Sequence, residues 1–176
     1  GRTETLTCAS PGNGTGQHLA FELFASMAKV KMQHVPYRGS PQAATDLMGK
    51  RIDFWMDTPT AMLELIKDNK LRAVVTTGTE PFFALPDTPT ATSAGVPGYS
   101  VTSWLGIAGP AGLPADIHNR LSAEVHAVLA EPQTIERLRT LGSMTKPTTP
   151  QQFADRIGAD IAKWSAVVEA ANIERI

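Results

Sequence analysis

Apolar positions in the first eighty residues follow two alternating spacings. Short runs rich in β-branched and aromatic residues lie at 5–10, 32–37, 52–57 and 71–78, and each run stops near a proline or a glycine. Between them, apolar side chains recur every three or four residues over 15–28, 41–48 and 59–66, as on one face of a helix. Strands that alternate with helices of this length predict right-handed βαβ crossovers and a parallel sheet. We expect Ser40 to be the N-cap of the helix at 41–48.

The second half of the chain has a different pattern. Residues 80–100 are crowded with proline, glycine and threonine, which predicts a loop between two lobes. A fifth extended segment follows at 100–112, and helices are predicted over 114–129, 132–141 and 150–171. The last helix has apolar residues spaced as one buried stripe, namely Phe153, Ile157, Ile161, Trp164 and Val168. One extended segment makes a poor sheet alone, so we expect it to pair with strands outside this chain.

Composition narrows the classes of function. The chain has 176 residues, of which 42% are hydrophobic and 19% charged, so it can bury a globular core. A net charge of -1 argues against a nucleic-acid-binding protein, which needs an excess of lysine and arginine over acidic residues. The single cysteine, Cys8, forms no internal disulfide or zinc cluster and is expected to be a small buried side chain. No apolar run approaches the roughly 20 residues of a membrane helix, and the chain does not open with a signal-like segment.

The glycine-rich turn after the first predicted strand is the strongest candidate for a site. It reads Ser10-Pro11-Gly12-Asn13-Gly14-Thr15, and the helix at 15–28 follows. The first amides of a helix lack partners within it and carry the positive end of its dipole. Glycine lets a ligand approach the backbone, and the serine, asparagine and threonine add short polar groups. Since ligands of parallel sheets bind beyond the carboxyl ends of the strands, this turn is a candidate anion site.

Nucleotide phosphates fit this turn poorly. A P-loop requires a lysine after its second glycine, whereas Thr15 and Gly16 follow Gly14. A dinucleotide fingerprint requires a third glycine where Gln17 stands, and the strand at 32–37 ends in Tyr37 rather than in an acid. One alternative is that the glycines only form a tight turn and bind nothing.

The ends of the second and third predicted strands point to the same edge of the sheet. Tyr37, Gly39 and Ser40 follow the second strand, and Asp57 and Thr58 follow the third. Tyr37 offers a wall and a hydroxyl, and the helix that begins near Ser40 offers a second set of free amides. Asp57 would repel a carboxylate, so we expect it to cap its own helix or to accept from a ligand hydroxyl or amine.

A second alternative is a hydrolase that uses Ser10 and His18, with Asp57 as the third member of a triad. The Gly-x-Ser-x-Gly elbow of many hydrolases is absent around Ser10. The remaining histidines, His34, His118 and His126, fall on separate predicted elements, and we expect ordinary surface or rim residues there.

The combination of "VPYRG", "LPDTPT" and "SWLGIAGPAG", in this order after "SPGNGTGQHLAFELF", resembles the Bug-type extracytoplasmic solute receptors. These are the substrate-binding proteins of tripartite tricarboxylate transporters, and the resemblance covers nearly the whole chain. It implies a type II periplasmic-binding-protein fold whose two lobes close over a small organic carboxylate. It also implies a periplasmic location, a membrane permease as partner, and neither a cofactor nor covalent chemistry.

The resemblance assigns the parts of the chain. Residues 1–8 match a crossover strand, 9–98 the ligand-binding α/β lobe, and 99–176 the C-terminal part of the first lobe. Ser10, Gly14 and Thr15 match the turn that holds the ligand carboxylate, and Tyr37 and Gly39 match a second loop of the site. The position of Asp57 varies with the ligand in the family, and Trp104 matches a position near the crossover, where we expect packing.

One departure from the family is the missing N-terminal half of the first lobe, which follows a signal peptide in its members. We expect this chain either to be a fragment or to obtain the missing surface from another copy, as a homo-oligomer formed through the segment at 100–108.

Overall fold

The computed structural model describes residues 6–173, and the chain divides into two compact units. The first unit comprises Gly1–Ser103 and Trp164–Ile176, and the second comprises Trp104–Lys163. The domain boundaries expected from the sequence stay a prediction.

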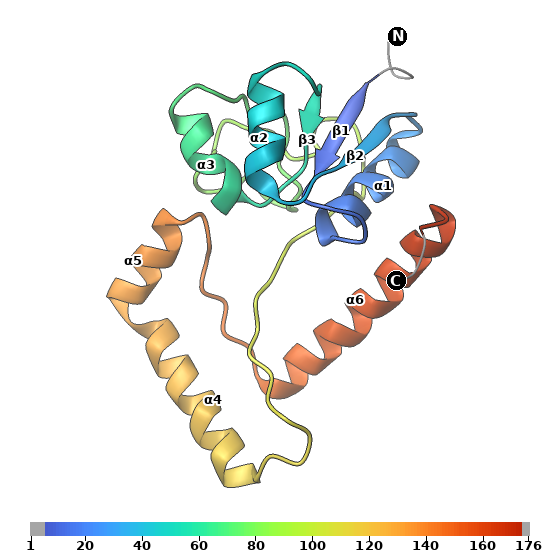
Figure 1. Ribbon diagram of the computed structural model, residues 1–176. Coiled ribbons are helices and arrows are strands. Elements are labelled where there is room, and N and C mark those ends of the chain that lie inside the picture. The colour runs from blue at the N-terminus through green and yellow to red at the C-terminus, as the bar shows by residue number, and fades with distance from the viewer. Residues whose placement is uncertain (1–5, 174–176) are drawn as a thin grey trace. The chain divides into compact units, whose positions relative to one another are not determined.

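A three-stranded parallel sheet organises the first unit (Figure 1). Its strands are β1 (Thr7–Ser10), β2 (Gln33–Pro36) and β3 (Phe54–Trp55), in the order β2-β1-β3. Ser10 pairs with Pro36 of β2, and Ala9 pairs with Trp55 of β3. All three strands therefore end at one edge of the sheet, as the alternation of strands and helices predicts. Thr5, the first residue of the first predicted strand, lies outside the described residues.

The strands present alternate side chains to different helices. Ala9 of β1 packs with Ala43 of α2 (Ser40–Met48) and with Ile52 in one apolar cluster. His34 of β2 instead stacks on His18 of α1 (Gly16–Ala28). This alternation follows from the period of two along a strand, and it fixes which residues meet the start of α1.

Each helix that follows a strand begins at the carboxyl edge of the sheet. Thr15 is the N-cap of α1, where its side chain accepts from the backbone N–H of His18. The prediction that Ser40 caps the second helix is wrong, because Gly39, with φ 131°, is the N-cap and Ser40 is already helical. The third helix, α3 (Pro59–Lys67), follows Thr58 as its N-cap.

The strand predicted at 71–78 does not form a ladder. One bridge joins Thr76 of this segment to Thr90. The next residue, Thr77, contacts Val101: its carbonyl accepts from the Val101 N–H, and its hydroxyl donates to the Val101 carbonyl. Pro89 lacks a backbone N–H to extend the bridge, so the apolar run is held by isolated contacts. The β-branched pattern identified an extended segment but not its partner strands.

The second unit contains α4 (Ala115–Ala130), α5 (Pro132–Thr140) and most of α6 (Pro150–Ala170), which continues into the first unit. The Trp104 indole donates to Asp160 (2.6 Å), and its ring meets that of Phe153 edge to face at 5.1 Å. A side chain at Gly106 would meet the Phe153 ring, which would have to move to admit it. Trp104 thus contacts two residues of α6, while 40% of its surface stays exposed.

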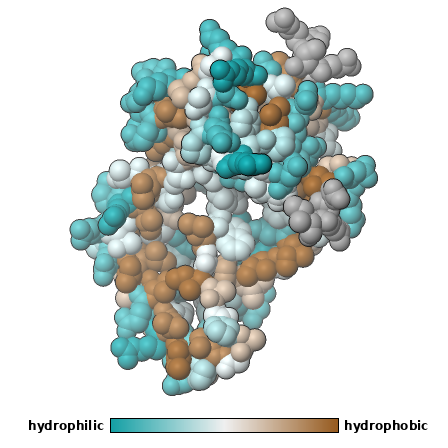
Figure 2. Space-filling model, in the orientation of Figure 1, coloured by the Kyte–Doolittle hydropathy of each residue, from teal (hydrophilic) through white to brown (hydrophobic). Residues whose placement is uncertain are grey.

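Many apolar side chains of the second unit face solvent (Figure 2). Leu105 is 99% exposed and Ile107 is 78% exposed, and neither lies in a strand. The buried stripe predicted for the last helix is wrong: Ile161 is 62% exposed, and the other four residues of the stripe are only partly buried. Val167, which the stripe did not include, is the residue of α6 that is buried. These faces have the amphipathic spacing of core helices but lack a covering layer within the described chain.

Candidate functional site

The turn between β1 and α1 has a backbone shape that favours glycine. Gly12 and Gly14 have φ values of 153° and 71°, which residues with a side chain rarely adopt. A Cβ at Gly12 would also approach the carbonyl of Tyr37 to 3.4 Å. The two glycines therefore allow the chain to leave β1 and enter α1 beside the end of β2.

Side chains of the protein hold several polar groups of this turn. The Gly12 N–H donates to Ser10 Oγ (3.2 Å), and the Gly14 N–H donates to His18 Nδ1 (3.1 Å). The hydroxyl of Thr15 donates to the Gly12 carbonyl (2.8 Å). Ser10, which is fully buried, and Thr15 thus shape the turn through their side chains.

Other amides of the same turn remain available. Among the described residues, no acceptor is within hydrogen-bond reach of the backbone N–H groups of Asn13, Gly16 and Gln17. Asn13 and Gly16 are exposed, and they lie at the positive end of the α1 dipole. A small anion could accept from these amides without displacing a bond within the protein.

Two histidines lie directly beneath the turn. The rings of His18 and His34 stack with centroids 3.8 Å apart and an interplanar angle of 8°. His34 Nε2 is 2.7 Å from Ser10 Oγ, so the serine hydroxyl forms a hydrogen bond within the protein. Burial and the neighbouring His18 lower the pKa of His34 to about 4. The prediction of a surface or rim residue is therefore wrong for His34, because β2 brings it against α1.

Asp57 joins the three strand ends. Its carboxylate accepts from the Gln17 side chain (3.0 Å), the Ser40 hydroxyl (2.5 Å) and the Thr58 N–H (2.7 Å). These donors belong to the starts of α1 and α2 and to the N-cap of α3, so one carboxylate ties together the three helices that surround the edge. The Thr58 hydroxyl lies 2.9 Å from that of Thr60.

Tyr37 is anchored on two sides. Its backbone N–H donates to the Ser10 carbonyl (3.0 Å), and its hydroxyl donates to Asp46 Oδ2 (2.9 Å). Burial, followed by the bond to Asp46, raises the pKa of the Tyr37 phenol, while Arg51 and Tyr37 hold the pKa of Asp46 low. The Tyr37 hydroxyl is thus directed to α2, and its role as a wall of the site stays a prediction. No sequence signal paired Tyr37 with Asp46.

The residues suggested for a catalytic triad are not assembled as one. Ser10 contacts His34 instead of His18, and Asp57 bonds donors from three helix starts. The Ser10 hydroxyl has no exposed surface, so a substrate cannot reach it. The arrangement is suited to holding a turn rather than to nucleophilic attack.

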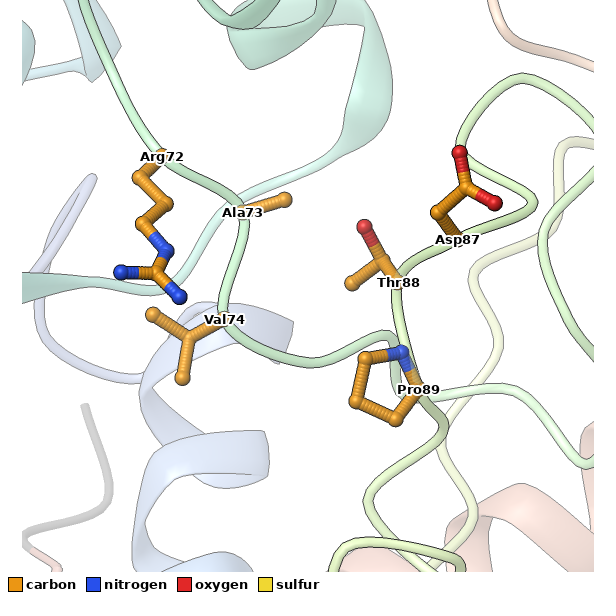
Figure 3. Close-up of a pocket in the computed structure, with 6 residues that line it drawn as sticks. All are labelled: Arg72, Ala73, Val74, Asp87, Thr88 and Pro89. Atoms are coloured by element: carbon orange, nitrogen blue, oxygen red, sulfur yellow. The ribbon is translucent and has the colours of Figure 1, made fainter.

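A separate hollow of about 550 Å³ lies between residues 72–74 and 87–89 (Figure 3). Its lining consists of Arg72, Ala73, Val74, Asp87, Thr88 and Pro89, most of which are exposed. None of them belongs to the glycine turn or to the three strand ends. The anion site argued above does not depend on this hollow.

A sequence model of the family described as "Tripartite tricarboxylate transporter family receptor" matches residues 2–173. The chain belongs to this family. It is 37% identical over 164 residues to a UPF0065 protein from the tcbD–tcbE intergenic region of Pseudomonas sp. (strain P51). That match covers 93% of this chain and 49% of the relative.

Solved structures agree with the family assignment. R. palustris Rpa4515 with adipate superposes with a TM-score of 0.87 at 31% identity, over 97% of this chain and 57% of that one. MatC from Rhodopseudomonas palustris with bound malate superposes with a TM-score of 0.78 at 29% identity, over 93% of this chain and 56% of that one. The fold is thus that of periplasmic binding proteins, and this chain spans about half the length of these relatives.

These similarities are to solute-binding receptors and not to enzymes. In the part of the chain that the structure describes, no group of three or more histidine, cysteine or acidic side chains could hold a metal ion. No helix between residues 6 and 173 has both the length and the apolar character required to cross a bilayer.

Proposed function

We propose that this chain supplies the ligand-binding lobe of a periplasmic receptor for a small organic carboxylate. The whole receptor would pass its ligand to the membrane permease of a tripartite tricarboxylate transporter. Family membership supports this role, as do the adipate and malate named for two structural neighbours. Ligand chemistry in those proteins makes a small dicarboxylate the first class to test.

One observation carries the proposal: the exposed turn after β1 has three amides without acceptors among the described residues, at Asn13, Gly16 and Gln17. They are gathered where the dipole of α1 is positive and where the parallel strands end. A carboxylate has enough oxygen lone pairs to accept from all three.

The other predicted site residues have two kinds of proposed role. Tyr37, Gly39 and Ser40 form the neighbouring wall of the site, and Thr58 its far end. Ser10, Gly12, Gly14 and Thr15 set the shape of the turn through the bonds among themselves and to the histidines. Asp57 holds these walls together and, through its charge, favours ligands that place a hydroxyl or amine nearby.

Replacing Gly16 by proline would remove one donor of the site and leave the fold intact. Gly16 is the first residue of α1, where proline is tolerated because the N–H has no helical partner. Thr15, at φ -69° and ψ 156°, already has the extended conformation that a residue before proline requires. We expect Gly16→Pro to weaken binding of adipate or malate about tenfold, the loss expected for a hydrogen bond to a charged group.

Isothermal titration calorimetry on Gly16→Ala provides the matched control. A Cβ at Gly16 meets no atom within 4 Å, so alanine retains both the N–H and the helix start. Equal affinities of the proline and alanine variants would contradict a role for this amide. Failure of every small carboxylate to bind the folded wild-type chain would instead support the alternative that the turn binds nothing in this chain.

A further inference from the structure

The His18–His34 stack is coupled to the turn through one direct hydrogen bond. His18 is 6% exposed, and its Nδ1 accepts from the Gly14 N–H at 3.1 Å. A ring nitrogen that accepts a hydrogen bond carries no proton, so this contact requires Nδ1 of His18 to be unprotonated. The other ring nitrogen, Nε2, lies 3.5 Å from the Glu22 carboxylate.

The orientation of the His18 ring is determined by its neighbours. His34 covers one face of it in a nearly coplanar stack, and the Ser10 hydroxyl and the Phe21 ring hold His34 in turn. Because these contacts restrict the ring, the position of Nδ1 is also restricted. Gly14 has φ 71°, and no atom lies within 4 Å of its Cβ position. Among the described residues, the hydrogen bond to His18 is therefore the contact that holds the Gly14 backbone in place.

We propose that His18 is a positioning residue for the anion site, which it serves by holding the Gly14 amide with an unprotonated Nδ1. The bond keeps the turn in the shape that presents the amides of Asn13, Gly16 and Gln17 together. This inference rests on the proposed function, because it assigns His18 a role in presenting the carboxylate site of that proposal.

Two substitutions test the acceptor at position 18. In His18→Asn the amide Oδ1 can take the place of Nδ1 as an acceptor, whereas His18→Leu supplies no acceptor. His118→Asn removes an exposed histidine at the first turn of α4 and is the matched control. Adipate and malate are the probes, and comparing variants at one pH cancels the protonation of the ligand itself.

We expect His18→Leu to bind about fivefold more weakly than wild type at about pH 7.5, the loss expected for one ordinary hydrogen bond, with a smaller loss in His18→Asn. His118→Asn should bind as tightly as wild type. Equal losses of affinity in His18→Leu and His18→Asn, or no loss in either variant, would overturn the proposal.

A measurement on the free protein tests the contact without a ligand. The amide ¹H and ¹⁵N NMR shifts of Gly14 should change in His18→Leu, which removes the acceptor, and should change much less in His18→Asn and not at all in His118→Asn. Gly14 shifts that change equally in the folded His18→Leu and His18→Asn variants would overturn the positioning role. If the Gly14 shifts respond as expected and no variant binds adipate or malate, the proposed function fails, and the role of His18 in binding fails with it.

Discussion

His34 lies partly buried against α1, with its ring stacked on His18 and its Nε2 beside the Ser10 hydroxyl. Nothing in the local sequence "MQHVPY" distinguishes this histidine from one on a surface. The parallel pairing of β2 with β1 places it opposite Cys8, on the face that α1 covers. The neutral form is favoured there because burial disfavours the charged ring and His18 lies in contact.

This pKa makes the folded chain less stable in mild acid. Between the ordinary histidine pKa of about 6.5 and the folded value of about 4, the unfolded chain binds a proton at His34 that the folded chain does not. The free energy of unfolding should therefore fall as pH decreases through this window. Urea denaturation at about pH 7 and about pH 5 measures the fall, and His34→Gln should show a smaller one. An equal fall in both proteins would contradict this account.

The starts of α1, α2 and α3 are joined by polar contacts more than by apolar packing at this edge. Asp57 accepts one hydrogen bond from the first turn of α1, one from the first residue of α2 and one from the N-cap of α3. The expectation that Asp57 caps its own helix is wrong, because Thr58 is the N-cap of α3. Asp57 instead connects three separate helix starts, which the sheet brings within reach of one carboxylate.

Removing this carboxylate should loosen the whole edge. We expect Asp57→Ala to lower the free energy of unfolding by about 2 kcal/mol, since donors to a charged acceptor lose their partner together. Asp68→Ala is the control, because Asp68 is exposed and forms one ion pair with Lys70, worth roughly 0–1 kcal/mol. Chemical denaturation of the two variants measures the difference, and equal losses would argue against the three-helix junction.

Across the molecule, burial is distributed unevenly. Every described residue that is both apolar and fully buried, from Cys8 to Tyr99 and at Val167, belongs to the first unit. In the second unit Leu105 and Ile107 are exposed, as are apolar side chains of α4 and α5 such as Ile117, Leu121 and Ile135. Exposed apolar side chains on an extended segment favour association with another chain.

We therefore expect this chain to self-associate as its concentration rises. Leu105→Lys with Ile107→Lys should shift sedimentation velocity profiles toward the monomer, because the two most exposed apolar side chains of the extended segment become charged. Gln133→Lys with Ser165→Lys adds the same charge at exposed polar positions and should leave association unchanged. A wild-type chain that is monomeric at every concentration would refute this expectation.

The sequence by itself determined most helices, the parallel class of the sheet and the position of the glycine turn. These features depend on local causes: apolar spacing, prolines and glycines at element ends, and the short polar residues of the turn. The resemblance carried by "VPYRG", "LPDTPT" and "SWLGIAGPAG" also identified the family correctly. The predicted contacts between the turn and a ligand stay predictions.

Only the tertiary structure decided which polar groups meet. The stack of His18 on His34, the hydrogen bond between Ser10 and His34, and the junction at Asp57 each join residues from different elements. Such contacts depend on strand order, register and the face that each helix covers, none of which local spacing encodes. For the same reason the runs at 71–78 and 100–112 read as strands, since sequence pattern reports a tendency to extend but not the presence of a partner.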